Sequence, residues 1–261
     1  MSSAALTIKP LCDAAAHRAA WYARLKRLLD AVLALVGLVV SLPVLLAAAL
    51  LVKLTSRGPV LYSQVRLGLG GRPFRIYKLR TMTNNCEALS GPCWSTRGDP
   101  RVTRVGRFLR RTHLDELPQL WNILIGDMSL VGPRPERPEM VHGLQQVIPR
   151  YRERMADRPG LTGLAQVQLP PDTDLDSVRS KLAHDLCYLE RAGLWLDFRI
   201  VLATAARVLG VPATMTRAVL GLPGGAAVER AYRQSVEGHG AAPLAGRDEN
   251  AAAAVHGLQS A

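Results

Sequence analysis

The sequence is poor in aromatic residues and has no paired metal-binding cysteines. Each of these absences argues against one class of binding site. Only 5% of the 261 residues are Phe, Trp or Tyr, which is sparse for the base-stacking surfaces that bind single-stranded nucleic acid. The six histidines form no H-E-x-x-H motif, and no C-x-x-C pair is present. We therefore expect no nucleic-acid partner and no zinc site. Nothing demands disulfides, which suits a reducing cytosol. The four cysteines are Cys12, Cys86, Cys93 and Cys187.

Only one long apolar run is present, and a proline divides it. Ala31–Val52 holds 22 residues without a charge, which is long enough to cross a bilayer. Pro43 removes a helical hydrogen bond near the middle, and each half would then be only about 16–18 Å long. Basic residues flank both ends, which favours keeping both ends on the cytoplasmic side. From these residues alone, a spanning helix and a re-entrant helix both stay open.

Acidic residues are scarce in the segment that follows this run. Between Lys53 and Arg111 there are 13 Lys and Arg residues against two acids, so the segment carries +11 of the chain's net +12. A basic block next to a membrane segment indicates binding to anionic lipid. Composition therefore permits a membrane-anchored lipid-binding protein without catalytic activity, as one hypothesis of function.

Beyond the apolar run, the pattern predicts a mixed α/β fold that is mainly helical. Pro59–Arg80 reads as a β-hairpin around a glycine-rich turn that matches no phosphate-binding loop. Arg101–Arg111 is predicted to be an amphipathic helix at the lipid interface, with Phe108 as an anchor. The remaining predicted elements are helices over Met140–Arg154, Val178–Ala192 and Leu194–Leu209, a turn over Arg158–Gly163 and a strand over Leu164–Leu169.

The most informative stretch runs from Arg110 to Pro135 and contains two adjacent carboxylates, Asp115 and Glu116. Pro118 is tolerated in the first turn of a helix, so a helix is predicted from near Asp115 to a stop at Gly126. Thr112 and Asp115 also have the spacing of a capping box. Asp115 would then lie at the positive end of a helix, with Arg111 one turn upstream. For an isolated Asp-Glu pair, simple helix capping is the ordinary explanation.

The motifs around this carboxylate pair are more specific than the pair itself. The sequence resembles the bacterial sugar transferases, the monotopic polyprenyl-phosphate phosphoglycosyl transferases, from about Lys26 to about Gly210. The matching motifs, in the family's order, are YKLRTM (Tyr77–Met82), DPRVTRVGRFLR (Asp99–Arg110), RRTHLDELPQLWN (Arg110–Asn122), GDMSLVGPRPE (Gly126–Glu136) and RPGLTGLAQV (Arg158–Val167). His113 stands where many relatives have a small hydroxyl residue.

The resemblance implies a chemistry. Asp115 would be the nucleophile that attacks the sugar-bearing phosphate of a UDP-sugar. This attack would release UMP and leave a phospho-sugar bound covalently to Asp115. Polyprenyl (undecaprenyl) phosphate would then accept the sugar phosphate. Glu116 would assist as a Mg²⁺ ligand or acid–base group, and Asp115 with Glu116 suits Mg²⁺, which takes one or two carboxylates plus substrate phosphates. Substrate-binding candidates are Arg111 as a phosphate clamp, Pro133, Arg134 and Pro135 on the nucleotide side, and Lys78 and Arg80 toward a headgroup or acceptor phosphate.

The residue patterns and the family resemblance together predict how the chain is divided into segments. A leader over 1–24 precedes a re-entrant, helix-break-helix membrane segment over 25–56, as members of the family have there. A small cytosolic catalytic domain with the β-hairpin occupies 57–223, and a disordered tail is predicted over 224–261 because it is rich in Ala and Gly. The resemblance is to the minimal catalytic form, bound to membrane lipids on the cytoplasmic face of the bacterial inner membrane. A polytopic, metal-only transferase is the second enzymatic alternative, and one apolar stretch is too few for it.

Overall fold

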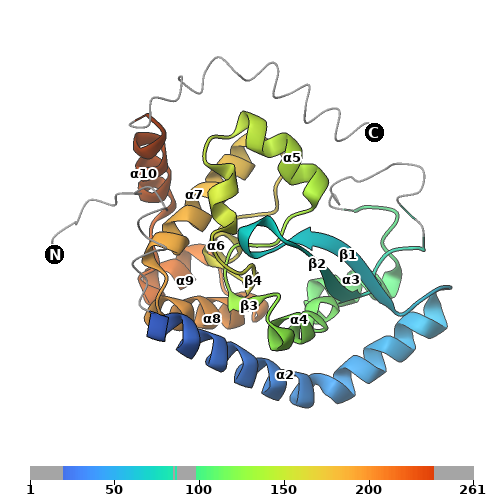
Figure 1. Cartoon of the computed structure of the whole chain (residues 1–261). Coiled ribbons are helices and arrows are strands. Elements are labelled where there is room, and N and C mark those ends of the chain that lie inside the picture. Colours follow the sequence, from blue (N-terminus) through green and yellow to red (C-terminus); the bar gives the residue numbers. More distant parts are fainter. Residues whose placement is uncertain (1–19, 85, 87–97, 238–261) are drawn as a thin grey trace.

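The computed structural model describes residues 20–84, 86 and 98–237 (Figure 1). The predicted leader therefore lies outside the described residues except for its last five, and so do the final 24 residues of the predicted tail. The described part is mainly helical and contains two small sheets of two strands each. This confirms the predicted fold class at the level of a mixed, mainly helical protein.

The apolar run forms one continuous helix, α2 (Ala20–Thr55), instead of two halves with a break. Figure 1 shows it curving under the rest of the molecule, with both ends reaching toward it. Pro43 lies inside the helix and withholds one backbone donor, which loosens a helix enough to bend it without ending it. Ser41 lies in the same region and donates from Oγ to the Leu38 carbonyl at 3.4 Å.

The two arms of α2, which are its segments before and after Pro43, both pack on the body of the protein. In the first arm, Ala34 joins a cluster with Ile76 of β2 (Pro73–Leu79) and Ile123 of α4 (Gln119–Ile125). In the second arm, Val52 joins a cluster with Leu79 and with Leu109 of α3 (Arg104–Arg111). Most of the remaining Leu and Val side chains of α2 are exposed. Of the described helices, α2 is the one long and apolar enough to cross a membrane.

The predicted hairpin is confirmed. Strand β1 (Leu61–Leu67) pairs antiparallel with β2 from Leu61↔Leu79 to Leu67↔Pro73. The glycine-rich turn between them is a short 3-10 turn, η1 (Leu69–Gly71).

Helix α3 follows the hairpin and starts three residues later than predicted. Its apolar side packs inward through Leu109, while Phe108, Arg104 and Arg107 are exposed. Gly106 allows this close packing, because a Cβ there would lie 2.0 Å from the carbonyl oxygen of Thr81. The close contact brings the first turn of α3 alongside Thr81, two residues after the end of β2.

The segment after α3 corrects the sequence prediction. No helix starts at Asp115: residues Leu114–Glu116 form a 3-10 turn, η2, and α4 begins only at Gln119 with Pro118 as its N-cap. The predicted stop at Gly126 is confirmed. The capping box is wrong, because Thr112 ends α3 and its hydroxyl donates to the Phe108 carbonyl at 3.0 Å. His113 in a left-handed conformation (φ 56°) separates the two segments, which is unusual for a residue with a side chain.

A parallel strand pair and two helices were also mispredicted. Strand β4 (Gly160–Thr162) lies in the predicted turn and pairs with β3 (Ser129–Val131). The predicted strand over Leu164–Leu169 is instead helix α6 (Leu164–Gln168), since a short apolar run does not distinguish the two structures. The predicted helix over Met140–Arg154 divides into α5 (Pro138–Val147) and the 3-10 turn η3 (Tyr151–Met155). Pro149 explains the division, because the residue before a proline disfavours helix.

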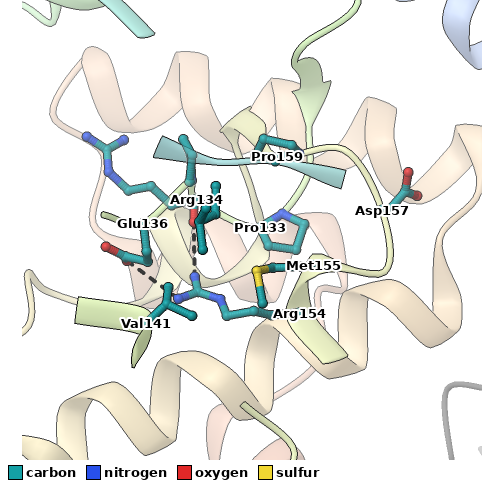
Figure 2. A pocket seen from close by; sticks show the side chains of 11 residues that line it. Pro133, Arg134, Glu136, Val141, Arg154, Met155, Asp157 and Pro159 are labelled. Carbon is teal, nitrogen blue, oxygen red and sulfur yellow. Dashed lines mark hydrogen bonds and ion pairs between the residues drawn. The ribbon is translucent and has the colours of Figure 1, made fainter. Parts of the chain in front are cut away.

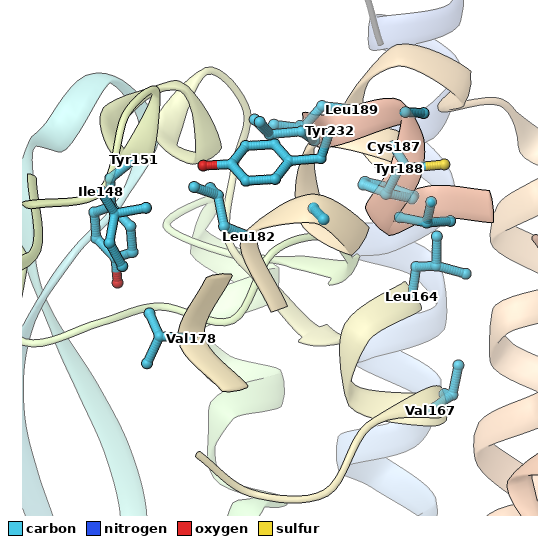
Figure 3. Close-up of a cluster of buried hydrophobic side chains, with 14 of the residues drawn as sticks. Ile148, Tyr151, Leu164, Val167, Val178, Leu182, Cys187, Tyr188, Leu189 and Tyr232 are labelled. Atoms are coloured by element: carbon cyan, nitrogen blue, oxygen red, sulfur yellow. The ribbon is translucent and has the colours of Figure 1, made fainter. Parts of the chain in front are cut away.

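The main hydrophobic core lies between α5, α6 and three later helices (Figure 3). Helices α7 (Leu175–Arg191) and α8 (Leu194–Val208) match their predictions closely. The predicted disordered tail is wrong over its first part: α9 (Ala213–Leu220) is followed by α10 (Gly225–Glu237), whose Val228, Tyr232 and Val236 are buried in this core. An apolar residue every three to four positions places those side chains on one face of a helix.

Candidate active site

Three segments distant in sequence meet at Glu116. Lys78 from the hairpin donates to Glu116 Oε1 at 2.7 Å, and Arg134 from the Pro133–Pro135 loop donates to the same oxygen at 2.5 Å. Arg134 Nη1 also reaches Oε2 at 3.5 Å. Two cations on one carboxylate hold the hairpin, η2 and the loop in a fixed relation. The structure thus brings together three of the residues that the sequence singled out.

Asp115 is adjacent but has a different environment. Its side chain is buried, with 7% of the residue exposed, and no hydrogen bond to it is found among the described residues. The charges that shift its pKa most are those of Glu116, Lys78 and Arg110. Asp115 is therefore a carboxylate that lies beside several cations. Its oxygens accept no hydrogen bond among the described residues.

The two carboxyl groups have pKa values shifted in opposite directions. Burial, and then the charge of Glu116, raise the pKa of Asp115, against the opposing charges of Lys78 and Arg110. Burial also favours the neutral form of Glu116, but the charges of Arg134 and Lys78 and their hydrogen bonds outweigh it and hold its pKa well below the usual range. Glu116 is thus ionised throughout the physiological range. That makes it a poor proton donor or acceptor at neutral pH.

Among the arginines of α3, it is Arg110 whose charge acts on Asp115. Its Nε donates to Thr81 Oγ1 at 2.9 Å, which holds the side chain near the end of β2. Arg111 is exposed, and the structure does not place it in this group. Sequence spacing along one helix suggested Arg111. The turn at His113 redirects the chain, so the preceding arginine faces the site instead.

Arg80 also lies apart from the carboxylate pair. Its guanidinium donates to the carbonyl and hydroxyl oxygens of Ser56, each at 2.8 Å, just beyond the last turn of α2. Only 5% of the residue is exposed. In this position Arg80 stabilises the carboxyl end of the apolar helix, where carbonyl groups lack helical partners.

A second layer of buried charges supports the Pro133–Pro135 loop (Figure 2). Arg154 donates to the backbone carbonyl of Arg134 at 3.1 Å and pairs with Asp185 at 2.6 Å. Glu136 pairs with Lys181 at 2.6 Å. Burial raises the pKa of Glu136, but the charges of Lys181, Arg154 and Arg66 outweigh it and lower the pKa to about 2. These partners come from α7, η3 and β1, so no local sequence pattern pointed to them.

A pocket opens beside this loop. It is lined by Pro133, Arg134 and Pro135, by Met155 at the end of η3 and Asp157 after it, and by the start of the hairpin turn. Figure 2 shows Pro133, Met155 and Pro159 around it, with Asp157 at one side. Gly160 lets the two strands behind the loop approach closely, because a Cβ there would lie 2.1 Å from the backbone nitrogen of Gly132. The pocket and the carboxylate pair share Arg134.

The residues present fit a magnesium ion bound together with a substrate, and they do not form a complete protein cage. No group of three or more His, Cys, Asp or Glu side chains with metal-binding geometry occurs among the described residues. Asp115, whose oxygens have no hydrogen bond there, can supply one ligand, and Glu116 Oε2 is the less occupied oxygen of its carboxylate. Mg²⁺ accepts one or two carboxylates when phosphate oxygens and water complete its shell.

Comparison with known proteins identifies the family. Residues 21–211 match the family described as "Bacterial sugar transferase". The chain belongs to this family. The match covers α2, the hairpin, both carboxylates and the Pro133–Pro135 loop, and it ends before α9 and α10.

Relatives of this sugar transferase carry specific names. A protein of Caulobacter vibrioides named "UDP-glucose:undecaprenyl-phosphate glucose-1-phosphate transferase" is 50% identical over 188 residues, which are 70% of this chain and 69% of that protein. A protein of Aeromonas hydrophila named "UDP-N-acetylgalactosamine-undecaprenyl-phosphate N-acetylgalactosaminephosphotransferase" is 45% identical over 188 residues, or 72% of this chain and 44% of that protein. The "Exopolysaccharide production protein PSS" of Rhizobium leguminosarum is 43% identical over 190 residues, or 71% and 95%. The match thus spans less than half of the Aeromonas relative but nearly all of the Rhizobium one.

Proposed function

We propose that this sugar transferase is a phosphoglycosyl transferase that moves a sugar 1-phosphate from a UDP-sugar to polyprenyl phosphate. The names of the Caulobacter and Aeromonas relatives support this reaction class. Those names differ in the sugar, so the sugar is left open. The reaction would be an early membrane step in assembling a polysaccharide, in line with the name of the Rhizobium relative.

The single observation that carries the proposal is the asymmetry of the two carboxylates. Glu116 is held by Lys78 and Arg134, whereas Asp115 beside it is buried and has no hydrogen bond among the described residues. A lipid-binding protein without chemistry would gain nothing from a buried carboxylate next to its cations, because a carboxylate repels anionic headgroups. A nucleophile needs unoccupied oxygens close to groups that attract the substrate phosphate.

In the proposed first step, a carboxylate oxygen of Asp115 attacks the phosphorus that carries the sugar. The new bond joins that oxygen to phosphorus, and the bond from this phosphorus to the bridging oxygen breaks. UMP leaves with the bridging oxygen and its electron pair. In the second step an oxygen of polyprenyl phosphate attacks the same phosphorus and Asp115 leaves as a carboxylate. Neither step requires a proton from the protein.

The surrounding cations have separate roles in this scheme. Arg110, Lys78 and Arg134 spread positive charge around the phosphoryl group, whose oxygens carry the negative charge of the transition state. Glu116 keeps Lys78 and Arg134 at a fixed spacing. When bound, Mg²⁺ would neutralise phosphate charge and polarise the phosphorus–oxygen bonds. Asp115 and Glu116 Oε2 are the protein ligands that we assign to it.

The helix α2 would deliver the second substrate by entering one leaflet of the membrane and returning. Both of its arms pack against the same body, while the exposed Leu and Val side chains between them face away. A helix that crossed the bilayer would separate its two ends by the membrane. We therefore propose a monotopic, re-entrant arrangement, with the body on the cytoplasmic face of the inner membrane and the acceptor phosphate within reach of the site.

A labelling experiment tests the reaction. Purified protein in detergent or nanodiscs is incubated with Mg²⁺ and a panel of UDP-sugars carrying radiolabel in the sugar, without acceptor. The wild-type chain should gain label and release UMP, and it should lose the label when polyprenyl phosphate is added. Asp115→Asn should gain none. Release of UDP as the stoichiometric product, or normal turnover by Asp115→Asn, would overturn the proposal.

A further inference from the structure

Gln119 is a buried polar side chain that the scheme above does not use. It lies at the start of α4 and is 1% exposed. Its amide nitrogen has no acceptor, and the side chain makes no hydrogen bond among the described residues. Asn122, one turn later in the same helix and equally buried, is different: its amide donates to the Arg75 carbonyl at 2.7 Å and accepts from the Tyr77 amide at 3.2 Å.

The backbone places Gln119 on the side of the carboxylate pair. Leu117 (φ −55°, ψ −35°) and Pro118 (φ −60°, ψ −17°) continue the helical path from η2 into α4. Residues three and four apart on such a path are neighbours on one face. Gln119 is three residues after Glu116 and four after Asp115. By this spacing, the donor without an acceptor lies on the same helical face as the carboxylate without a donor.

A structural role does not explain this side chain. A buried amide that forms no hydrogen bond destabilises a fold by roughly 1–3 kcal/mol, and an apolar residue of the same length would fill the space without that cost. Groups left unsatisfied in this way are rare in folded proteins and occur at functional sites. An acceptor that comes within hydrogen-bonding distance only during the reaction accounts for this side chain.

We propose that Gln119 is a positioning residue for Asp115. As Asp115 approaches phosphorus, the Gln119 amide donates to the carboxylate oxygen of Asp115 that does not attack, and so aims the other oxygen at phosphorus. The inference rests on the proposed function, because it assigns the attack to Asp115. A hydrogen bond formed only as the reaction proceeds lowers the barrier without tightening substrate binding.

The test compares two single substitutions in α4. Gln119→Met keeps the length of the side chain and removes the amide, while Asn122→Leu removes an amide whose hydrogen bonds are all formed. Thermal unfolding, the rate of covalent labelling by radiolabelled UDP-sugar in a single turnover, and KM for the donor are measured for both and for the wild type.

We expect Gln119→Met to unfold at the wild-type temperature or above it. It should label about 10- to 100-fold more slowly, which is the loss expected from misplacing a reacting group, with a KM within about twofold of the wild type, since uniform binding is unchanged. Asn122→Leu should unfold at a clearly lower temperature. Wild-type labelling by Gln119→Met, or destabilisation of it comparable to Asn122→Leu, would overturn the inference while leaving the proposed function intact. Failure of the wild type to take label would instead overturn the proposed function.

Discussion

At the scale of single residues, two adjacent carboxyl groups serve opposite purposes. Glu116 is stabilised in its ionised form by two cations, whereas the fold disfavours the ionised form of Asp115. The proposed function therefore depends on a group that the fold would be more stable without, which is common at reactive sites. The contrast between the two neighbours can be measured as stability against pH.

Replacing each carboxyl group by its amide should change stability in opposite directions at pH 7. Because the pKa of Glu116 is lowered in the folded state, ionised Glu116 stabilises the fold above the unfolded pKa of about 4.3. This stabilisation is lost progressively as pH falls below that value. Glu116→Gln should therefore be less stable at pH 7, by about 3–5 kcal/mol because Lys78 and Arg134 lose a common partner, and the deficit should shrink below about pH 4.

Asp115 has a raised pKa in the folded state, so its contribution to the free energy of unfolding falls as pH rises above its unfolded pKa of about 3.9. Asp115→Asn should match or exceed the wild type in stability at pH 7. Chemical denaturation at pH 7 and pH 3.5 checks both variants. A large loss of stability in Asp115→Asn at pH 7 would contradict the environment described for this residue.

The two neighbouring arginines Arg110 and Arg111 form a second residue-scale comparison. Arg110 is held against Thr81 and acts on Asp115, while Arg111 is exposed. Arg110→Ala should reduce turnover by about 100-fold or more, the usual loss when a group that stabilises the transition state is removed. Arg111→Ala should retain most of the activity, and Arg110→Lys should fall between, since an ammonium cannot bind phosphate bidentately. Equal losses in both alanine variants would show that membrane-facing charge, and not the position of Arg110, is what matters.

At the scale of elements, α10 is the main addition to the part of the chain that matches the family. It packs on α7 through buried Val228, Tyr232 and Val236, and Tyr232 donates from its hydroxyl to the Pro149 carbonyl at 3.0 Å. Arg150 donates to Ser235 at 2.6 Å, so the helix also holds the start of η3. Because η3 carries Arg154, which supports the Pro133–Pro135 loop, α10 is linked to the site through two layers of contacts.

Truncation at two points should separate α10 from the residues after it. A chain ending at Gly224 should be destabilised by about 5 kcal/mol, from the apolar area of three large side chains and their neighbours. A chain ending at Glu237 should unfold at the wild-type temperature. Both are measured by thermal unfolding in the same detergent. Equal unfolding temperatures for the two truncated chains would mean that α10 does not stabilise the core.

At the scale of the whole molecule, α8 adds exposed aromatic side chains to the exposed apolar side chains of α2. Leu196 and Ile200 of α8 are buried in the main core, while Trp195 and Phe198 on its other side are exposed and stack at 5.7 Å between ring centroids. The helix therefore both packs on the core and offers an apolar face outward. Aromatic side chains of this kind favour the interface of a bilayer.

The re-entrant arrangement predicts the location of the two ends of α2. Ala23→Cys and Pro59→Cys, both at exposed positions, should react with thiol reagents from the same side of the membrane in intact cells and in permeabilised ones. The wild-type chain gives the background from its own cysteines. Pro43→Leu should shift part of the population to opposite sides, because it restores a straight helix. Labelling of the two positions from opposite sides in the unmodified helix would contradict the arrangement.

The sequence by itself determined the features that depend on neighbouring residues. The hairpin, α7, α8 and the stop of α4 at Gly126 follow from local periodicity, turn residues and glycine. The family followed from several motifs in a fixed order, and with it came the pair Asp115 and Glu116. These features are encoded within a few residues of one another, so a pattern could find them.

Only the tertiary structure decided which groups meet and in what state. It placed Lys78 and Arg134 on one oxygen of Glu116, left Asp115 and Gln119 without partners among the described residues, and put Arg110 in the place that spacing suggested for Arg111. It also folded residues 225–237 onto α7, where composition had indicated disorder, and made a strand of a predicted turn. The reason is physical: burial, charge and hydrogen bonding depend on segments that are distant in sequence, and a local pattern does not record which of them will become neighbours.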